Sequence, residues 1–273
     1  MPASLKLETL NIWGGRVYGP LMEHVQKQEQ KVDIFCFQEV YSTPLNRIHT
    51  RDSLLPHPPL HPTNDSPARA NIYQELSRAL STFHGHYASS QDRYDIHGPV
   101  DYVLSFGLAM FVKNTIQIER EGDLFIHKEK NSVVGSDNAT LGRNLQYVQF
   151  LRGGKQFTVV NLHGLWNGNG KTDSLERIEQ SHKTKAFLDS VSGAKILCGD
   201  FNLLPDTDSL AILEQGMRNL VKEYGITSTR SRFYEKPDKF ADYILVSPEV
   251  VVEDFQVLDE AVSDHLPLLL EFR

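Results

Sequence analysis

Short apolar runs recur along the whole 273-residue chain, and they limit its possible folds more than any other feature of the sequence. Each run is five to eight residues long and rich in Leu, Ile, Val and Phe, which is typical of β-strands. The runs occupy residues 5–10, 33–38, 107–112, 145–151, 157–162, 195–199, 242–247 and 265–272. Amphipathic segments that predict helices separate some of them, at residues 19–31, 70–83, 173–191 and 206–216. Because these elements intermingle to the last residue and no linker divides them, the sequence predicts one α/β or α+β domain over residues 1–273.

The composition is that of an ordinary globular protein, with 40% hydrophobic and 23% charged residues. No apolar run approaches the ~20 residues that span a bilayer, and no secretory signal opens the chain. Cys36 and Cys198 lie inside apolar runs, which favours reduced core thiols and a cytoplasmic protein. The net charge of −7, without a dense Lys/Arg cluster, argues against strong non-specific binding of duplex DNA. The many prolines of residues 55–67 predict a loop.

Polar side chains stand at one end of six of these runs. Asn11, Glu39, His163, Asp200 and Asn202 follow four of the runs, whereas Asp242, Asp264 and His265 stand at the start of the last two. If the last two strands run antiparallel to the other four, all of these side chains meet at one edge of the structure. Each residue taken singly also suits a turn, a strand end or a structural role, so the prediction depends on their convergence.

The chemistry of such a group can be stated from its residue types. Acids and amides are the oxygen ligands of a hard divalent cation such as Mg²⁺ or Mn²⁺, and the lack of Cys/His pairs argues against zinc. A cation of this kind with a spare carboxylate and imidazoles suits phosphoester hydrolysis. The carboxylate would activate water, and the imidazoles would stabilise charge on the phosphoryl oxygens.

The ordered motifs "LNIW", "FQEV", "VNLHGLW", "CGDFNLLP", "ADYILVS" and "SDHLPL" resemble those of the endonuclease/exonuclease/phosphatase superfamily. The resemblance runs from about residue 5 to residue 272. It implies a DNase I-like fold, a two-sheet mixed β-sandwich flanked by helices. It also implies a metal-dependent phosphoric ester hydrolase with Mg²⁺ or Mn²⁺ as cofactor. Glu39 looks like the principal metal ligand, with Asn11 arranging the site and Asp264 near the metal.

The same resemblance implies roles for five further residues. Asp200 would orient or deprotonate the attacking water, and Asn202 would hold the phosphate or the nucleophile. His265 would contact the scissile phosphate, and Asp242 would orient that histidine. His163 matches a histidine that many non-nuclease and tyrosyl-phosphodiesterase members carry after the corresponding strand.

The substrate stays open at this point. Trp13 stands where many DNA-acting members have an acid, and several sphingomyelinase-like members similarly have Asn-x-Trp-Gly. Trp166 and Lys171, in a glycine-rich loop, are candidate substrate contacts through stacking and attraction to phosphate, and Arg143 is a third; an ordinary polar loop is the alternative.

Nucleic acid, a nucleotide, an inositol phosphate and a phospholipid head group are therefore all candidate substrates of a monomer without a transmembrane segment. The chain is either a nuclease or a sphingomyelinase-like phosphodiesterase or inositol-phosphate phosphatase. The alternative of another class is an inactive binding module with the same fold.

Overall fold

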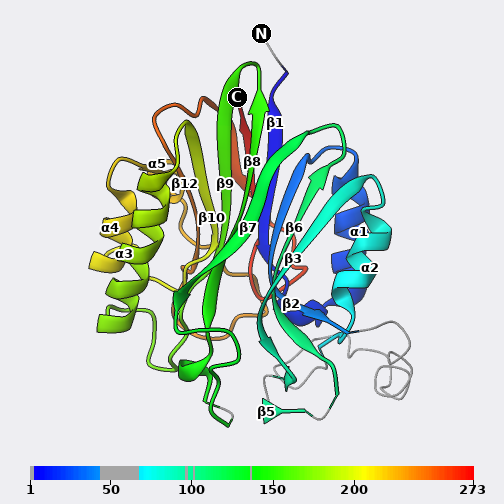
Figure 1. Ribbon diagram of the computed structural model, residues 1–273, viewed down its shortest axis with the longest axis vertical. Coiled ribbons are helices and arrows are strands. Elements are labelled where there is room, and N and C mark those ends of the chain that lie inside the picture. Colours follow the sequence, from blue (N-terminus) through cyan, green and yellow to red (C-terminus); the bar gives the residue numbers. More distant parts are fainter. Residues whose placement is uncertain (1–2, 44–67, 96–97, 101, 136) are drawn as a thin grey trace.

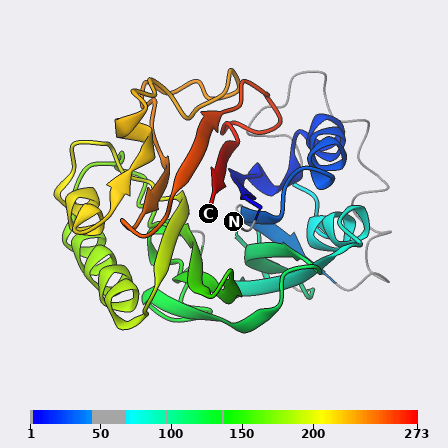
Figure 2. The same cartoon turned by 90° about the horizontal axis from the view of Figure 1, so that it is seen from above.

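The computed structural model describes residues 3–43, 68–95, 98–100, 102–135 and 137–273, so the proline-rich stretch 55–67 lies outside the described residues. Two six-stranded mixed sheets pack face to face, and the helices lie on the outside of the sandwich (Figures 1 and 2). This is the sandwich flanked by helices that the sequence predicts.

The first sheet has the strand order β13-β14-β1-β2-β6-β3. Its strands are β1 (Leu5–Asn11), β2 (Ile34–Ser42), β3 (Phe83–Asp92), β6 (Ser105–Lys113), β13 (Val252–Val257) and β14 (Leu268–Phe272). Strand β1 runs parallel to β2 and antiparallel to β14. The carboxyl ends of β1 and β2 therefore lie beside the amino end of β14.

The second sheet has the order β11-β12-β10-β9-β8-β7. Its strands are β7 (Ile118–His127), β8 (Arg143–Arg152), β9 (Lys155–His163), β10 (Ala194–Asp200), β11 (Arg218–Asn219) and β12 (Asp242–Val246). Strand β9 runs parallel to β10, and β12 runs antiparallel to it. A small separate ribbon pairs β4 (Tyr94–Asp95) with β5 (Gly98–Pro99).

The helices divide between the two outer faces. Helices α1 (Tyr18–Glu29) and α2 (Ile72–Ala79) cover the first sheet, and α3 (Leu175–Ser190) and α4 (Asp208–Glu214) lie on the side of the second (Figure 2). The shorter elements are η1 (Trp13–Gly15), η3 (Asn138–Thr140) and α5 (Leu220–Glu223). Within the described part of the chain, no helix combines the length and the apolar character that crossing a membrane requires.

Two apolar layers hold these elements together. Strand residues from both sheets, such as Ile34, Val159 and Ile196, fill the space between the sheets. A second cluster, which includes Leu21 and Leu76, joins α1 and α2 to the outer face of the first sheet. Cys36 and Cys198 are buried with free thiols in the first layer, as their apolar surroundings in the sequence predict.

The structure corrects three details of the expected helices. The predicted helix 70–83 ends at Ala79, and Phe83 begins β3 instead of extending an apolar stripe. The predicted helix 173–191 begins at Leu175, after Ser174, whose side chain caps α3 by accepting a hydrogen bond from the backbone N–H of Arg177. Leu175 itself is 81% exposed, so the apolar face of α3 begins after its first residue.

Candidate active site

The predicted polar residues gather at one end of the sandwich. Asp200 lies opposite His163 on β9 and opposite Asp242 on β12, so these side chains stand at one level on three adjacent strands. Asn11 ends β1 beside Gln38 of β2. Strand β12 runs antiparallel to β10, and β14 runs antiparallel to β1. The polar residues at the start of these two strands therefore lie beside those at the ends of β1, β2, β9 and β10, as the sequence predicts. A pocket of about 210 Å³ opens at this end.

The pocket receives nine of the eleven residues singled out in the sequence. Those that line it are Glu39, Arg143, His163, Trp166, Lys171, Asp200, Asn202, Asp264 and His265. Asn11 is fully buried and Asp242 nearly so, and both lie behind this lining. The two side chains therefore act on the pocket through their neighbours.

A hydrogen-bonded bridge joins the two sheets at the floor of the pocket. The Asn11 amide donates to Glu39 Oε1 over 3.1 Å and to Asp200 Oδ2 over 3.0 Å. Glu39 reaches this point because β2 bulges between Phe37 and Val40, where Glu39 adopts a φ of 55°. A positive φ is costly for a residue with a side chain, and such strain is concentrated at functional sites.

Burial and nearby carboxylates disfavour the ionised form of Glu39. Burial, followed by the repulsion of Asp264, raises the pKa of Glu39 to about 7, although the hydrogen bond from Asn11 opposes the shift. The side chain nonetheless keeps 26% of its surface exposed to the pocket. Its carboxylate is thus accessible to a ligand that compensates its charge.

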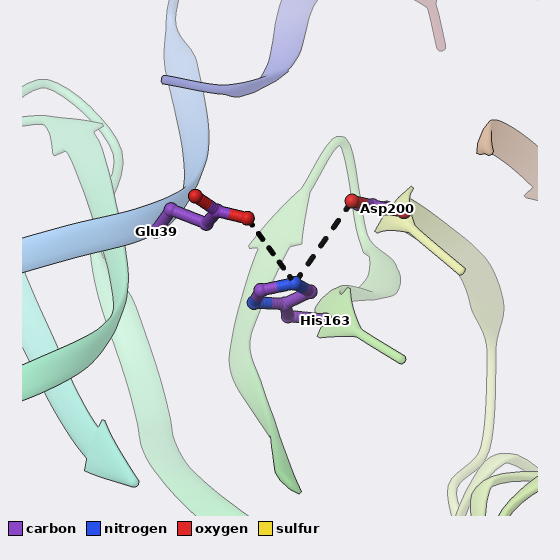
Figure 3. Close-up of side chains that lie close together, drawn as sticks. All are labelled: Glu39, His163 and Asp200. Atoms are coloured by element: carbon purple, nitrogen blue, oxygen red, sulfur yellow. Dashed lines mark ion pairs between the residues drawn. The ribbon is translucent and has the colours of Figure 1, made fainter. Parts of the chain in front are cut away.

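His163 faces the same carboxylates from β9 (Figure 3). Its Nε2 lies 3.8 Å from Glu39 Oε1 and 3.9 Å from Asp200 Oδ2. The Arg143 guanidinium lies 3.1 Å from the Nδ1 of this ring. Burial and the charge of Arg143 hold the pKa of His163 well below its usual value, so the ring is neutral near pH 7.

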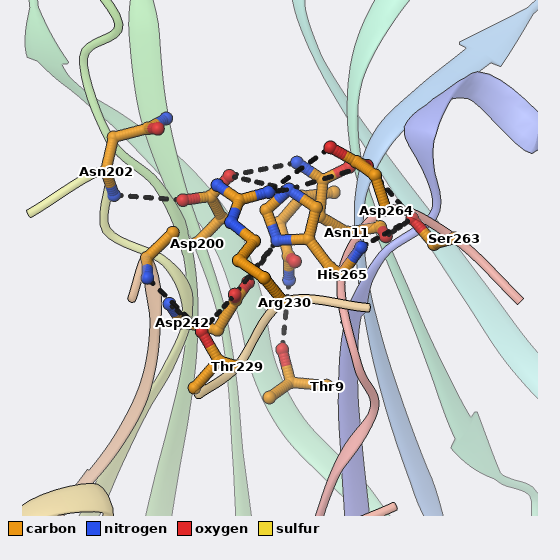
Figure 4. A network of polar contacts seen from close by, with 12 residues as sticks. Thr9, Asn11, Asp200, Asn202, Thr229, Arg230, Asp242, Ser263, Asp264 and His265 are labelled. Atoms are coloured by element: carbon orange, nitrogen blue, oxygen red, sulfur yellow. Dashed lines mark hydrogen bonds and ion pairs between the residues drawn. The ribbon is translucent and has the colours of Figure 1, made fainter. Parts of the chain in front are cut away.

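A second histidine, His265, lies beside Asp200 and Asp242 (Figure 4), with its Nε2 3.6 Å from Asp200 Oδ2. Asp242 binds its Nδ1 at 2.7 Å and is itself held by the Thr229 hydroxyl at 2.9 Å. An Arg230 N–H contacts Nε2, which fixes the neutral tautomer with the proton on Nδ1 because a guanidinium only donates. Burial and Arg230 lower the pKa of His265 to about 4, and burial raises that of Asp242 to about 6.

The "GDFN" stretch makes the turn that presents Asp200 and Asn202. Gly199 has a φ of 131°, and a Cβ there would lie 2.1 Å from the carbonyl oxygen of Leu162 on β9. Asp200 Oδ1 accepts the backbone N–H of Asn202 over 2.9 Å, and the Asn202 amide donates to the carbonyl of Gly164 over 3.2 Å. The turn is therefore required by close strand packing and is also part of the pocket wall.

The loop of residues 164–172 forms a second wall of the pocket. Arg177 of α3, with only 1% of its surface exposed, donates to the carbonyls of Leu165, Gly170 and Thr172 and to the side chain of Asn167. This single guanidinium holds the loop despite its glycines, so that Trp166 and Lys171 have fixed positions.

Lys171 is almost fully buried at the inner end of that loop. Its Nζ donates to the Tyr234 hydroxyl over 3.2 Å and to the Phe240 carbonyl over 3.0 Å. Burial, followed by the charge of Arg230, lowers the pKa of Lys171 to about 8. Several positive charges are thus held close together.

Sequence reasoning missed three pocket residues between α5 and β12, namely Arg230, Tyr234 and Lys236. Arg230 bridges His265 and Asp264, with 3.3 Å to the Asp264 carboxylate, and its guanidinium lies 4.1 Å from the centre of the Tyr234 ring. The basic fragment "STRSR" at residues 228–232 is the sequence signal that could have found Arg230.

The donor set fits a hard divalent cation. Carboxylate oxygens of Glu39 and Asp200, together with a ring nitrogen of His163, lie within 4.8 Å of one another. The amide of Asn11 fixes both carboxylates, and Asp264 adds negative charge nearby. A cation at this point would compensate the repulsion that raises the pKa of Glu39. No cysteine lines the pocket among the described residues, which does not suit a soft metal.

Comparisons with known proteins agree with this geometry. The model of the Endonuclease/Exonuclease/phosphatase family matches residues 9–265, whereas curated protein sequences give no match. The endonuclease/exonuclease/phosphatase of Bacteroides vulgatus has a similar structure, with a TM-score of 0.66, 19% identity and coverage of 99% of this chain and 98% of its own.

Two other similar structures come from proteins with more specific names. A mannosyl-6-phosphatase from Bacteroides thetaiotaomicron has a TM-score of 0.65 at 19% identity, over 99% of this chain and 100% of its own. A D. rerio TDP2 humanized by 14 mutations has a TM-score of 0.65 at 12% identity, over 99% of each chain. At these identities the likeness establishes the shared fold.

Proposed function

This chain belongs to the endonuclease/exonuclease/phosphatase family, and from that premise we propose that it hydrolyses phosphoester bonds with the help of Mg²⁺ or Mn²⁺. One observation carries the proposal. Glu39 of β2 meets Asp200 of the facing sheet and His265 of the segment before β14 in a single pocket, although these residues are up to 226 positions apart in the chain. An inactive module with the same fold would not need this complete set of acids and histidines.

The cation would be held by Glu39, with Asn11 orienting its carboxylate and Asp264 close by, which leaves Asp200 for the attacking water. When bound, it would polarise a phosphoryl oxygen and offset charge that builds up at phosphorus. The repulsion that raises the pKa of Glu39 would then be relieved, so that the carboxylate stays ionised at neutral pH.

The protein's own groups supply the remaining chemistry. Asp200 is nearly buried, and its Oδ1 is oriented by the Asn202 N–H, which suits it to accept a proton from an attacking water. Arg230 would donate N–H groups to the phosphoryl oxygens, and His265, fixed by Asp242, would position Arg230 through the contact at Nε2. Asn202 would limit the orientations of the bound phosphate.

The assay for this proposal is hydrolysis of bis-p-nitrophenyl phosphate with Mg²⁺ or Mn²⁺, beside the same reaction in chelator. Glu39→Ala, Asp200→Ala and His265→Ala are each expected to lower kcat/KM by about a thousandfold, because each removes a group that acts on the transition state. Circular dichroism and thermal melting would verify that the variants are folded. Glu119→Gln, on the exposed edge strand β7, serves as the control that keeps activity.

The natural substrate class needs a wider screen. It should contain single-stranded DNA and RNA, abasic duplex, 5′-tyrosyl DNA, sphingomyelin, inositol phosphates and sugar phosphates. Hydrolysis that persists in chelator, or in Glu39→Ala, would contradict the metal-dependent mechanism. A folded protein that neither binds Mn²⁺ in calorimetry nor turns over any of these compounds would instead be an inactive binding module.

A further inference from the structure

The pocket would carry a net positive charge once a divalent cation is bound. The described residues that line it include four cationic side chains and three carboxylates. The cations are Arg143, Lys171, Arg230 and Lys236, and the acids are Glu39, Asp200 and Asp264. Asp242, directly behind this lining, contributes a fourth carboxylate, so the formal charges of these side chains balance. A bound divalent cation would leave two positive charges in surplus, which a phosphate dianion compensates and a diester monoanion does not.

Three of these cations surround the carboxylates from different elements. Arg143 begins β8 and contacts His163, whereas Arg230 precedes β12 and contacts both His265 and Asp264 (Figure 4). Lys171 comes from the loop after β9. An anion bound among them would be approached from several sides by charged N–H donors, which is the arrangement that recognises phosphoryl oxygens.

The walls of the pocket are braced against each other. Lys171 lies 4.9 Å from the centre of the Tyr234 ring, and Lys236 lies 4.9 Å from the centre of the Trp166 ring. Each loop thus gives one lysine to an aromatic ring of the other loop. These reciprocal contacts fix the width of the pocket on this side.

The space inside is small and partly aromatic. Its volume of about 210 Å³ lies below the usual range for drug-sized ligands, and Trp13, Phe106 and Trp166 contribute apolar surface. A phosphodiester within a polymer must leave the site in two directions. A terminal phosphate can enter such a pocket first, so that only one substituent has to be accommodated outside it.

Resting on the proposed function, we propose that the substrate is a small phosphomonoester whose dianionic phosphoryl group is bound by Arg143, Lys171 and Arg230. Water adds to phosphorus, and the bond from phosphorus to the alcohol oxygen breaks. One proton of the water ends on the alcohol and the other remains on inorganic phosphate. A diester has one negative charge fewer and leaves part of this positive surface uncompensated.

The test compares two substrates that share a leaving group, p-nitrophenyl phosphate and bis-p-nitrophenyl phosphate, at equal Mg²⁺ or Mn²⁺. The proposal expects kcat/KM for the monoester to exceed that for the diester by about tenfold or more. A hexose phosphate and a 5′-phosphorylated oligonucleotide, followed by release of inorganic phosphate, then distinguish a small molecule from a nucleic acid end. The hexose phosphate should be the better substrate of these two.

Lys171→Gln tests the charge surplus directly. Glutamine can still donate to the Phe240 carbonyl, but it lacks the charge, so monoester kcat/KM should fall about tenfold while diester kcat/KM changes less than about threefold. Lys183→Gln, on the exposed face of α3, is the matched control and should change neither value. Arg230→Gln repeats the test if Lys171→Gln does not fold. In calorimetry, the wild type should bind inorganic phosphate with a lower Kd than dimethyl phosphate. Lys171→Gln should reduce the ratio between these two Kd values.

The outcomes separate the two proposals. Equal or better hydrolysis of the diester, or preference for the oligonucleotide, overturns the small phosphomonoester but leaves phosphoester hydrolysis standing. An equal loss on both ester types in Lys171→Gln and in Arg230→Gln also overturns it, since the charge would then serve any phosphate. No hydrolysis of any compound by folded protein with either metal overturns the proposed function and this inference with it.

Discussion

Some buried residues of this protein are charged, and each is stabilised by a group of opposite charge in contact with it. His24 of α1 is a clear case, because both of its ring nitrogens contact carboxylates. Nε2 lies 2.8 Å from Glu8, which is fully buried on β1, and Nδ1 lies 2.6 Å from Glu260 in the segment between β13 and β14. Burial alone would lower the pKa of His24, but the two carboxylates outweigh it and raise that pKa above its usual value of 6.5.

His24→Gln is therefore expected to lower stability in a pH-dependent manner. A histidine whose pKa is higher when folded adds stability that is fully present below its unfolded pKa of 6.5, and that stability is lost as pH rises through the folded value. The difference in unfolding free energy between wild type and variant should be about 2 kcal/mol near pH 5.5 and smaller near pH 8.5. Urea unfolding across this range measures it. His182→Gln on the exposed face of α3 should show no such trend, and a constant difference for His24→Gln would contradict the ion pairing.

At the scale of elements, the position of the loop 164–172 depends on helix α3. None of the described residues of α3 lines the pocket, yet Arg177 of this helix donates hydrogen bonds to three carbonyls and one side chain of the loop. Gln180, one turn later, accepts the backbone N–H of Leu165 over 2.9 Å. The helix therefore determines where Trp166 and Lys171 stand.

Arg177→Ala should consequently damage both stability and the pocket. It leaves several buried carbonyls without their donor, so a loss of about 3 kcal/mol in unfolding free energy is expected, with a rise in KM for any phosphoester. Chemical denaturation and steady-state kinetics measure the two effects. Lys185→Ala on the same helix breaks only its exposed pair with Asp189 and should cost less than about 0.5 kcal/mol. Unchanged KM in Arg177→Ala would mean that the loop keeps its position without the guanidinium.

Central strands of this protein are predictable from sequence, whereas edge strands are not. All eight apolar runs are strands, because a strand buried on both faces needs a nearly continuous apolar run. The missed strands β3, β7, β11 and β13 are the edges of the two sheets. Strand β13, for example, buries only Phe255 and exposes polar neighbours, so its sequence resembles a loop. The polar ends of the central strands were predictable because a charged residue directly after a long apolar run is easily recognised in the sequence.

Pocket residues outside strands were harder to find. Arg230 lies twelve residues before the start of β12 in a polar stretch, and its local sequence resembles any solvated loop. Arg230 contacts His265 and Asp264, which precede β14 and lie more than 30 residues further along the chain. Only the folded chain shows these contacts. Trp166 and Lys171 were predictable because their glycine-rich loop directly follows the strand that ends at His163.

At the scale of the molecule, the two sheets are joined by polar groups at the pocket end. Gln38 of β2 donates to Asn161 of β9 over 2.7 Å, and the Asn161 amide returns a bond to the Phe37 carbonyl over 3.1 Å. Asn11 and Asp200 form the next bridge outward. A cation between Glu39 and Asp200 would complete this series across the sandwich, so its binding should be coupled to the stability of the whole fold.

Mn²⁺ should therefore raise the melting temperature of the wild type, and chelator should reverse the effect. At a concentration about a hundredfold above Kd, ligand binding adds about 2.7 kcal/mol, which corresponds to about 5 to 10 °C for a domain of this size. Glu39→Gln should abolish the increase, because it removes a carboxylate shared between the sheets, whereas Glu119→Gln should keep it. Differential scanning calorimetry measures the shift. An equal shift in Glu39→Gln would place the cation elsewhere.

The pairing of β1 with β14 has a practical consequence at this scale. Leu5 lies opposite Phe272, so the chain enters and leaves the fold at neighbouring points, on the side away from the pocket (Figures 1 and 2). A fusion partner, affinity tag or solid support attached there would leave the mouth of the pocket free. The same closeness of entry and exit would allow the fold to be grafted as an insert into a surface loop of a host protein.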